Sequence, residues 1–364
     1  MPMRKIDEID SNLKVDTSIS EPDIRFLDVR REPFRVYGLY NYKEEPVFKR
    51  IPDKVAAATN DGVAQLYLNT AGGRVRFSTD SRYVAIKAVM PSVTVLPHMP
   101  LSGTSGFDLF ADEGSASTYY GTFMPPMGMR DGYESILYFT EPGEKNLTIN
   151  FPLYNSVNSL YIGLQKSAHV GSGAEYAYRK PVLYYGSSIT QGGCASRPGN
   201  SYQAIISRRL NCDYINLGFS GCARGEEAIA DYMSGMDVSV FVCDYDHNAP
   251  NADYLAATHE KLFQKIRAKS GSLPVILVSR PDFDKNYQDS VKRRDVVYTT
   301  FIHAVKNGDQ NVYFVDGQRL FKEEYRDCCT VDGCHPNDAG FLRMAEAIGH
   351  SVGQVLLRSR DTAF

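Results

Sequence analysis

Residues 182–190 read Val-Leu-Tyr-Tyr-Gly-Ser-Ser-Ile-Thr, a short apolar run that ends in a turn of glycine and serines. Helix-like material follows around residues 202–210, and a second apolar run ends at Gly218. The rhythm of strand, helix and strand continues through three further apolar runs, at residues 238–243, 275–278 and 312–315. Short apolar runs that alternate with helices indicate a parallel sheet covered on both faces.

The helices predicted between these runs each have one apolar face. One such face is formed by Leu255, Leu262, Phe263 and Ile266, and another helix is predicted near residues 291–305. The last predicted helix has a longer apolar stripe, made of Phe341, Met344, Ala345, Ile348, Val352 and Leu356. We therefore predict a flavodoxin-like, doubly wound α/β domain with five parallel strands over residues 171–364. Ligands bind beyond the carboxyl ends of the strands in such folds, so functional residues are expected in the loops after the strands.

Residues 24–170 show a different pattern. Apolar and polar residues alternate with period two in runs such as 84–90 and 147–151, and turn-forming stretches separate these runs. This pattern predicts an antiparallel, jelly-roll-like β-sandwich as an accessory domain, with residues 1–23 as an extension before it. A small-residue stretch at 167–174 is expected to be a linker or an exposed loop.

The composition limits the class of protein. A chain of 364 residues suggests about two domains, and 43% hydrophobic residues provide enough apolar material for folded cores. A net charge of -3 creates no field that attracts polyanions, so neither nucleic acid nor a membrane is expected as a partner. The seven cysteines form no CxxC pair, and the charged amino terminus lacks the apolar core of a secretory signal. We expect a cytoplasmic protein with reduced thiols, and export of a longer precursor is the alternative.

Four loops after predicted strands carry residue types used in catalysis, at 186–190, 218–221, 244–248 and 332–335. Ser188 lies in the first of these turns, where its hydroxyl can face a substrate and its own N–H can face an oxyanion. Serine becomes a nucleophile only when a base takes its proton, and a carboxylate usually orients that base. Asp332 and His335 supply both groups, three residues apart.

Gly221 and Asn248 complete this set. A glycine lets a backbone N–H approach a substrate closely, and an asparagine side chain can donate a further hydrogen bond to an oxyanion. Each residue also has a common structural alternative: Ser187 or Ser188 as a helix cap, Gly221 as a turn residue, and Asn248 as a turn or cap. No single residue of the set indicates a function. The complete set, in this order after these strands, indicates acyl chemistry.

Together the four segments resemble the SGNH hydrolase superfamily, also called the GDSL family, whose four sequence blocks supply Ser, Gly, Asn and His. The resemblance covers about Pro181 to Leu357. The usual Gly-Asp-Ser of the first block reads Gly186-Ser187-Ser188, which keeps the nucleophile and loses the neighbouring carboxylate. The Gly-x-Ser-x-Gly elbow of α/β-hydrolases is absent, because Thr190 occupies the position of its second glycine.

The resemblance implies a role for each of these residues. Ser188 is then the nucleophile, His335 the general base and Asp332 the residue that orients His335. Ser188, Gly221 and Asn248 are then the donors of the oxyanion hole.

The first part of the chain resembles the subgroup that has an amino-terminal β-sandwich with a Gly-x-Asp-Leu-Tyr motif. Residues 106–110, Gly-Phe-Asp-Leu-Phe, match that motif with Phe in place of Tyr, and residues 152–155 and 193–199 also look like the subgroup. Asp108 is expected to be a turn or cap residue. Arg197 is a candidate for binding a substrate oxygen, and an ion pair with a neighbouring acid is the equally strong alternative.

Other side chains near the predicted site suggest competing chemistry. A thiol nucleophile is a weaker alternative to Ser188, because three cysteines lie beside the four segments: Cys194, Cys222 and Cys334. A metal site of Cys334, His335 and Asp332 would need further ligands, so no metal and no other cofactor is expected. His247 is a candidate second base or substrate contact, although a loop histidine is more often structural or solvated.

The sequence therefore predicts a serine esterase that hydrolyses an acyl ester through an acyl-enzyme on Ser188. The resemblance implies that the acyl group is acetyl and that the ester is a small molecule or a carbohydrate. One alternative is an acyltransferase that passes the acyl group to an alcohol acceptor. Another is a carbohydrate-binding protein whose catalytic domain is vestigial. The oligomeric state is not predicted.

Overall fold

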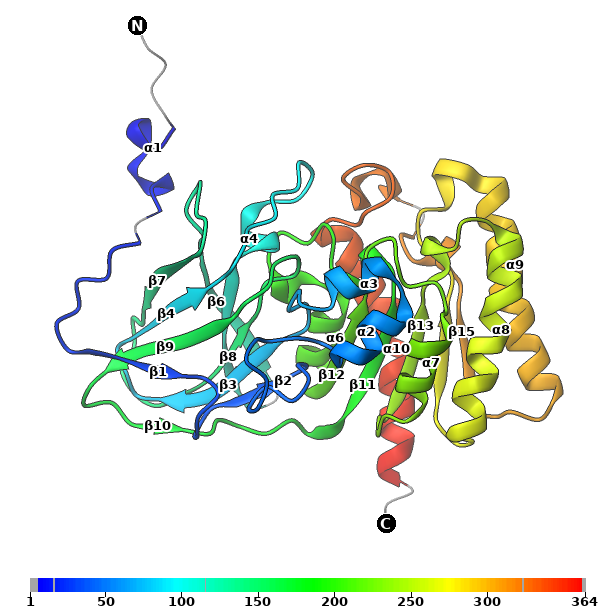
Figure 1. Cartoon of the computed structure of the whole chain (residues 1–364), viewed down its shortest axis with the longest axis horizontal. Coiled ribbons are helices and arrows are strands. Elements are labelled where there is room, and N and C mark those ends of the chain that lie inside the picture. The colour runs from blue at the N-terminus through cyan, green and yellow to red at the C-terminus, as the bar shows by residue number, and fades with distance from the viewer. Residues whose placement is uncertain (1–5, 16, 115, 323, 362–364) are drawn as a thin grey trace, which may run out of the picture.

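The computed structural model describes residues 6–15, 17–114, 116–322 and 324–361. A β-rich amino-terminal domain lies beside an α/β carboxy-terminal domain, as the colours from blue to red show (Figure 1). The short helix α1 (Ile6–Ile9) stands away from both domains (Figure 1). None of the described helices is long and apolar enough to span a bilayer.

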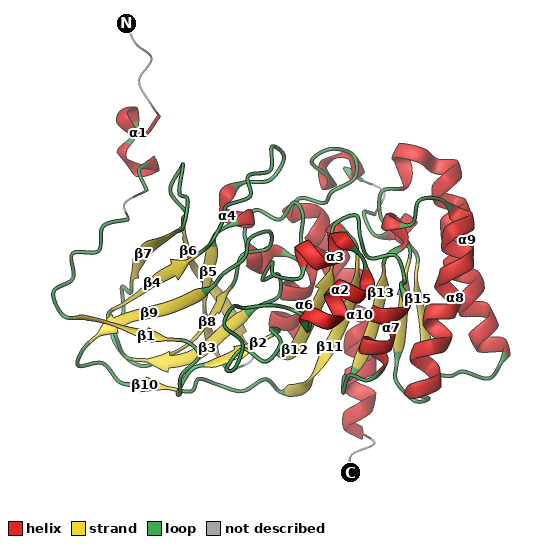
Figure 2. Cartoon of the chain, in the orientation of Figure 1, coloured by secondary structure: helices red, strands yellow, loops and turns green. Residues whose placement is uncertain are grey.

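The amino-terminal domain is a jelly roll. One sheet has the strand order β1-β9-β4-β7, and the other has the order β10-β3-β8-β5-β6, with β2 (Arg35–Tyr37) also paired to β3. The antiparallel pairs are nested: β1 (Ile24–Asp28) with β9 (Ser159–Gln165), β3 (Arg74–Thr79) with β8 (Lys145–Asn150), β4 (Tyr83–Val89) with β7 (Gly132–Tyr138), and β5 (Phe107–Glu113) with β6 (Ala116–Phe123). Nested pairs wrapped over two sheets define a jelly roll, which confirms the predicted sandwich (Figure 2).

The carboxy-terminal domain contains a parallel sheet in the order β12-β11-β13-β14-β15. Its strands are β11 (Tyr178–Gly186), β12 (Cys212–Gly218), β13 (Val240–Asp244), β14 (Val275–Val278) and β15 (Val312–Val315). The second strand along the chain lies outside the first, and the others follow on the opposite side, which is the flavodoxin-like order. The predicted fold of this domain is confirmed.

Both faces of the parallel sheet are buried. In β11, Val182 and Tyr184 point into one core while Leu183 and Tyr185 point into the other, because successive side chains of a strand alternate. The first core is covered by α6 (Tyr202–Leu210) and α10 (Asp338–Asp361), and the second by α7 (Glu227–Ser234), α8 (Ala252–Lys269) and α9 (Tyr287–Lys306). All six residues of the stripe predicted for the last helix are buried in the first core.

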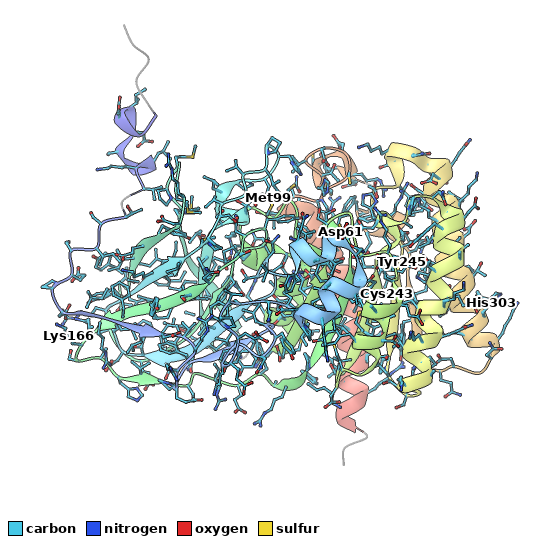
Figure 3. The ribbon with its side chains drawn as sticks, viewed as in Figure 1. Asp61, Met99, Lys166, Cys243, Tyr245 and His303 are labelled. Atoms are coloured by element: carbon cyan, nitrogen blue, oxygen red, sulfur yellow. The ribbon has the colours of Figure 1, made fainter. Side chains whose placement is uncertain are left out.

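A segment from the first fifth of the chain packs on the α/β domain. It contains α2 (Asp53–Thr59) and α3 (Asp61–Leu66), and its residues Ile51, Ala56 and Val63 belong to the second core of that domain. Asp61, at the start of α3, lies over the α/β domain (Figure 3). The sequence does not predict these helices, because each is too short to show a helical repeat.

Buried arginines join the two domains. Arg74, in β3, forms an ion pair with Asp213 of β12, and its guanidinium stacks 3.9 Å from the centre of the Tyr214 ring. Arg50, which lies just before α2, donates to the carbonyl oxygen of Gly218 at 2.5 Å and to that of Leu66 at 2.7 Å. Gly218 ends β12, so Arg50 holds the start of one of the predicted functional loops.

Candidate active site

Ser188 is the first residue of α5 (Ser188–Gln191), directly after β11. The side chain of the preceding serine caps this helix, because Ser187 Oγ accepts a hydrogen bond from Ile189 N at 3.1 Å. The sequence leaves open which of the two serines caps this helix. Ser187 is the cap, and the hydroxyl of Ser188 makes a different contact. Ser188 is 6% exposed, and its N–H belongs to the first turn of a helix, where no intrahelical acceptor is available.

His335 lies next to the Ser188 hydroxyl. The distance from Ser188 Oγ to His335 Nε2 is 3.0 Å, and the distance from His335 Nδ1 to Asp332 Oδ2 is 2.8 Å. Because the Asp332 carboxylate accepts the proton on Nδ1, the other ring nitrogen is free to accept the serine proton. Ser188 and the Asp332–His335 pair, predicted from two separate loops, thus meet in one relay.

Backbone donors hold Asp332 in place. Its Oδ1 accepts from the backbone N–H of His335 at 2.8 Å and from that of Cys334 at 3.0 Å. Partial burial raises the pKa of Asp332, but the hydrogen bonds from the side chain and backbone of His335 outweigh this effect and lower the pKa to about 2. Asp332 is therefore an anion throughout the neutral range.

Gly221 and Asn248 are also brought together, but in a way the sequence does not predict. Gly221 has φ +70°, a conformation that favours glycine, and its N–H donates to Asn248 Oδ1 at 3.1 Å. Asn248 Nδ2 donates one hydrogen bond to the carbonyl oxygen of Phe219 at 2.9 Å. The N–H of Gly221 therefore faces Asn248, and the second proton of the Asn248 amide is the one left for a ligand.

The jelly roll supplies part of the site. Tyr154 OH donates to the carbonyl oxygen of Ser188 at 3.1 Å, and Gln191 Nε2 donates to the carbonyl oxygen of Leu153 at 3.1 Å. Both bonds fix α5 against the segment 152–155 that resembles the sandwich subgroup. Asn155 in the same segment donates to the carbonyl of Thr104 at 3.0 Å and accepts from Thr94 N at 2.6 Å.

His98 reaches the site from the loop that Asn155 anchors. The centre of its ring lies 5.3 Å from that of His335, at an interplanar angle of 51°. Its neighbour Met99 packs in the first core of the α/β domain and is labelled near the junction of the two domains (Figure 3). The sequence gives no local signal for His98, because the contact depends on how the two domains dock.

The expectation for Asp108 is wrong. Asp108 is no turn or cap residue but lies inside β5, fully buried, because it faces the α/β domain. Its carboxylate accepts from Arg197 Nη1 at 3.0 Å, from Gly199 N at 2.8 Å and from Asn150 Nδ2 at 2.9 Å. Arg197 thus has the acidic partner that the sequence left as an alternative, and its guanidinium also lies 3.8 Å from the centre of the Tyr119 ring. A substrate contact by Arg197 has no support in this geometry.

His247 packs behind the relay. Its Nε2 lies 2.8 Å from Cys334 Sγ, and its Nδ1 lies 3.6 Å from Asp282 Oδ1. Neither His247 Nδ1 nor Asp282 Oδ1 has a hydrogen-bond partner among the described residues. Burial lowers the pKa of His247, although the charge of Asp282 opposes that effect. No contact of His247 with Ser188 is seen in the described residues, so its role as a base or substrate contact stays a prediction.

Burial disfavours the thiolate form of the cysteines near the site. Burial raises the pKa of Cys194 and that of Cys334 to about 12, and burial also raises the pKa of Cys222. A thiol with a raised pKa is a poor nucleophile at neutral pH. This favours Ser188 over a cysteine as the reacting group.

Comparisons with known proteins identify a family for each of the two domains. Residues 179–352 match the GDSL-like Lipase/Acylhydrolase family, and residues 24–170 match the family described as the N-terminus of Esterase_SGNH_hydro-type. No curated protein matches the sequence.

Three solved structures share the fold over nearly their whole length. A protein described as a GDSL-like lipase from Bacteroides ovatus is 26% identical, with a TM-score of 0.82 over 92% of this chain and 98% of that one. The salicylyl-acyltransferase SsfX3 of a tetracycline biosynthetic pathway is 18% identical, with a TM-score of 0.73 over 90% and 96%. A family two carbohydrate esterase from Clostridium thermocellum is 14% identical, with a TM-score of 0.62 over 89% and 98%.

The matches to the two families cover both domains in the order in which they occur along the chain. The chain therefore belongs to the GDSL-like lipase/acylhydrolase family of esterases and acylhydrolases, in the subgroup with a GxDLY-type amino-terminal domain.

Proposed function

We propose that this protein is a serine esterase in which Ser188 attacks the carbonyl carbon of an acyl ester. The observation that carries the proposal is the relay of Ser188 Oγ, the His335 ring and the Asp332 carboxylate, with distances of 3.0 and 2.8 Å. His335 Nε2 takes the serine proton as the new C–O bond forms, and then gives it to the departing alcohol. The acyl group remains on Ser188 until water, activated by the same nitrogen, releases it as a carboxylic acid.

The negative charge of the tetrahedral intermediate falls on the former carbonyl oxygen. The N–H of Ser188 at the start of α5 and the second amide proton of Asn248 are its proposed donors. The N–H of Gly221 joins them if the oxyanion replaces Asn248 Oδ1 as the acceptor of this N–H, or accepts it together with Asn248 Oδ1. Donors of this kind typically contribute about 3 to 4 kcal/mol each to lowering the barrier.

The proposed substrate is an acetyl ester of a carbohydrate. Support comes from the family resemblance and from the fold shared with the carbohydrate esterase of Clostridium thermocellum. Water is the proposed acceptor of the acyl group. The fold shared with an acyltransferase makes transfer to an alcohol the alternative outcome of the test.

The test uses a matched pair of serine variants. Ser188→Ala should abolish turnover of short aryl esters and labelling by a fluorophosphonate, because it removes the nucleophile. Ser187→Ala should retain both, because it removes only a helix cap, at a cost of about 1 kcal/mol in stability. Labelling and turnover that survive in Ser188→Ala would refute the proposal.

The substrate class needs a separate measurement. Acetylated sugars and longer acyl esters are incubated with the protein, with and without alcohol acceptors, and products are read by mass spectrometry. Release of acetate from the sugars at least about tenfold faster than release of longer acids supports a carbohydrate acetylesterase. Acyl products on the alcohol acceptor would instead identify a transferase, and sugar binding without any turnover would identify a binding protein.

A further inference from the structure

Three side chains of the types that bind transition metals converge beside Ser188. One ring nitrogen of His98, one of His335 and the sulfur of Cys194 lie within 4.8 Å of one another. They come from three separate segments: the jelly-roll loop before α4 (Leu101–Thr104), the loop after α5 and the loop before α10. The proposed mechanism uses only His335 among them.

The two histidines are available as ligands. His335 Nδ1 is held by Asp332, which leaves Nε2 as the nitrogen that faces Ser188. A carboxylate on the far nitrogen is the usual support for a metal-bound histidine, because it orients the ring and raises its basicity. His98 contacts the His335 ring and makes no hydrogen bond to any other described residue.

The ligand chemistry is selective. Two imidazoles and a thiol suit zinc and other borderline-soft cations, whereas magnesium and calcium prefer oxygen ligands. Ligand atoms around a tetrahedral zinc ion lie roughly 3.4–3.8 Å apart, so the observed limit of 4.8 Å exceeds that spacing by about 1.0–1.4 Å. The His98 side chain is only partly buried, so its rotation can shorten the distances from its ring to the other two ligands.

We propose that His98, Cys194 and His335 form an inhibitory binding site for zinc or a similar divalent cation. The metal binds the lone pair of His335 Nε2, which otherwise accepts the proton of Ser188. His335 can then no longer act as the base for Ser188. The Cys194 thiol loses its proton on binding, and a water molecule fills the fourth position. Inhibition rests on the proposed function of Ser188, whereas binding of the metal does not.

The binding test is independent of catalysis. The full-length Ser188→Ala variant is titrated with Co²⁺ alone, and the thiolate-to-cobalt charge-transfer band is followed in the near ultraviolet. One equivalent should produce the band. Cys194→Ala and Cys194→Ser in the same background should lose it, and His98→Asn should weaken binding by at least about tenfold. Thermal melting in the absence of metal shows whether each variant is folded.

A neighbouring group provides the matched control. His247, Asp282 and Cys334 also place possible ligand atoms within 4.8 Å of one another, behind His335. His247→Asn should leave the cobalt affinity unchanged within about twofold. Loss of cobalt affinity in His247→Asn but not in His98→Asn would place the metal at His247, Asp282 and Cys334. Absence of the charge-transfer band in Ser188→Ala would show that His98, Cys194 and His335 bind no cobalt. Either result overturns the proposal.

The inhibition test uses the protein with Ser188 intact. Zinc should inhibit hydrolysis of an aryl acetate, chelation should reverse the inhibition, and magnesium at the same concentration should have no effect. His98→Asn should need at least about tenfold more zinc for half-inhibition of its own activity. Cobalt binding without zinc inhibition would refute the inhibitory role. A chain that binds cobalt but hydrolyses no ester would instead refute the proposed function.

Discussion

Replacing Asp332 by asparagine tests the relay at the group farthest from the substrate. The carboxylate accepts three hydrogen bonds: two backbone N–H groups on Oδ1, and His335 Nδ1 on Oδ2. An amide has only one acceptor oxygen. If that oxygen keeps the two backbone donors, its NH₂ group faces His335 Nδ1, and the proton of the ring must move to Nε2. His335 then donates toward Ser188 and can no longer accept its proton.

The opposite orientation of the amide would place its NH₂ group against two backbone N–H donors. This second orientation loses the two hydrogen bonds from the backbone N–H groups and keeps only the one from His335 Nδ1. The first orientation is therefore the expected one. In a serine triad the wrong tautomer costs a factor of about 10⁴ in rate. Asp332 is 38% exposed, so solvent replaces part of its stabilisation of the charged ring. We therefore expect a loss nearer about 10³-fold in kcat/KM, or about 4 kcal/mol.

The measurement is kcat/KM on an aryl acetate, with Ser188→Ala defining the background rate. Circular dichroism and thermal melting are the control for whether Asp332→Asn is folded. Residues that act as one unit are not additive, so the double variant Asp332→Asn/His335→Ala should be no slower than His335→Ala alone. An Asp332→Asn enzyme that keeps more than about a tenth of the wild-type kcat/KM would refute the assignment of Asp332 as the orienting carboxylate.

Other changes test how the site is supported. Arg197→Ala should lower the free energy of unfolding in urea by about 3–5 kcal/mol, because it leaves the Asp108 carboxylate buried without its cation; adding Asp108→Asn should recover part of this loss, and an unchanged midpoint in the single variant would contradict the buried pair. Burial raises the pKa of Asp244 from 3.8 to about 8, so the folded protein holds a proton that the unfolded chain releases. Its stabilising effect is complete below about pH 4 and is lost as the pH rises to 8, on the order of 5 kcal/mol in total; Asp244→Asn should flatten this part of the stability curve, and parallel curves would show that Asp244 is ionised when folded. Arg50→Ala should destabilise the full chain by about 3 kcal/mol in the same assay, because carbonyl groups including that of Gly218 lose a buried donor; a loss below about 1 kcal/mol would refute this role.

The proposed reacting groups can be placed from the sequence because their positions follow from a local rule. Parallel strands bring their carboxyl ends to one edge of the sheet, so Ser188 and the Asp332–His335 pair can be placed at that edge without knowledge of packing. The choice between Ser187 and Ser188 as the capping residue needs coordinates, because both serines stand in the same turn. The hydrogen bond from Gly221 to Asn248 likewise depends on how two loops meet.

Contacts between the domains cannot be derived in the same way. Asp108 and Arg197 are 89 residues apart, and no periodicity in β5 shows that its polar side chain meets another domain. His98 lies in an irregular loop whose position depends on Asn155 and on the docking of Met99. The ion pair of Asp108 with Arg197 and the contact of His98 with His335 are therefore visible only in three dimensions.

The packing of residues 51–67 on the α/β domain makes the two halves of the polypeptide interdependent. A fragment that starts near residue 171 would lack Ile51, Ala56 and Val63 of the second core and would expose the surface of α7 against which α2 packs. During synthesis, residues 51–67 leave the ribosome before the helices on which they pack. Their apolar side chains stay uncovered until those helices have formed. The α/β domain therefore needs residues 51–67 for a complete core, and a fusion protein built from this domain has to include them.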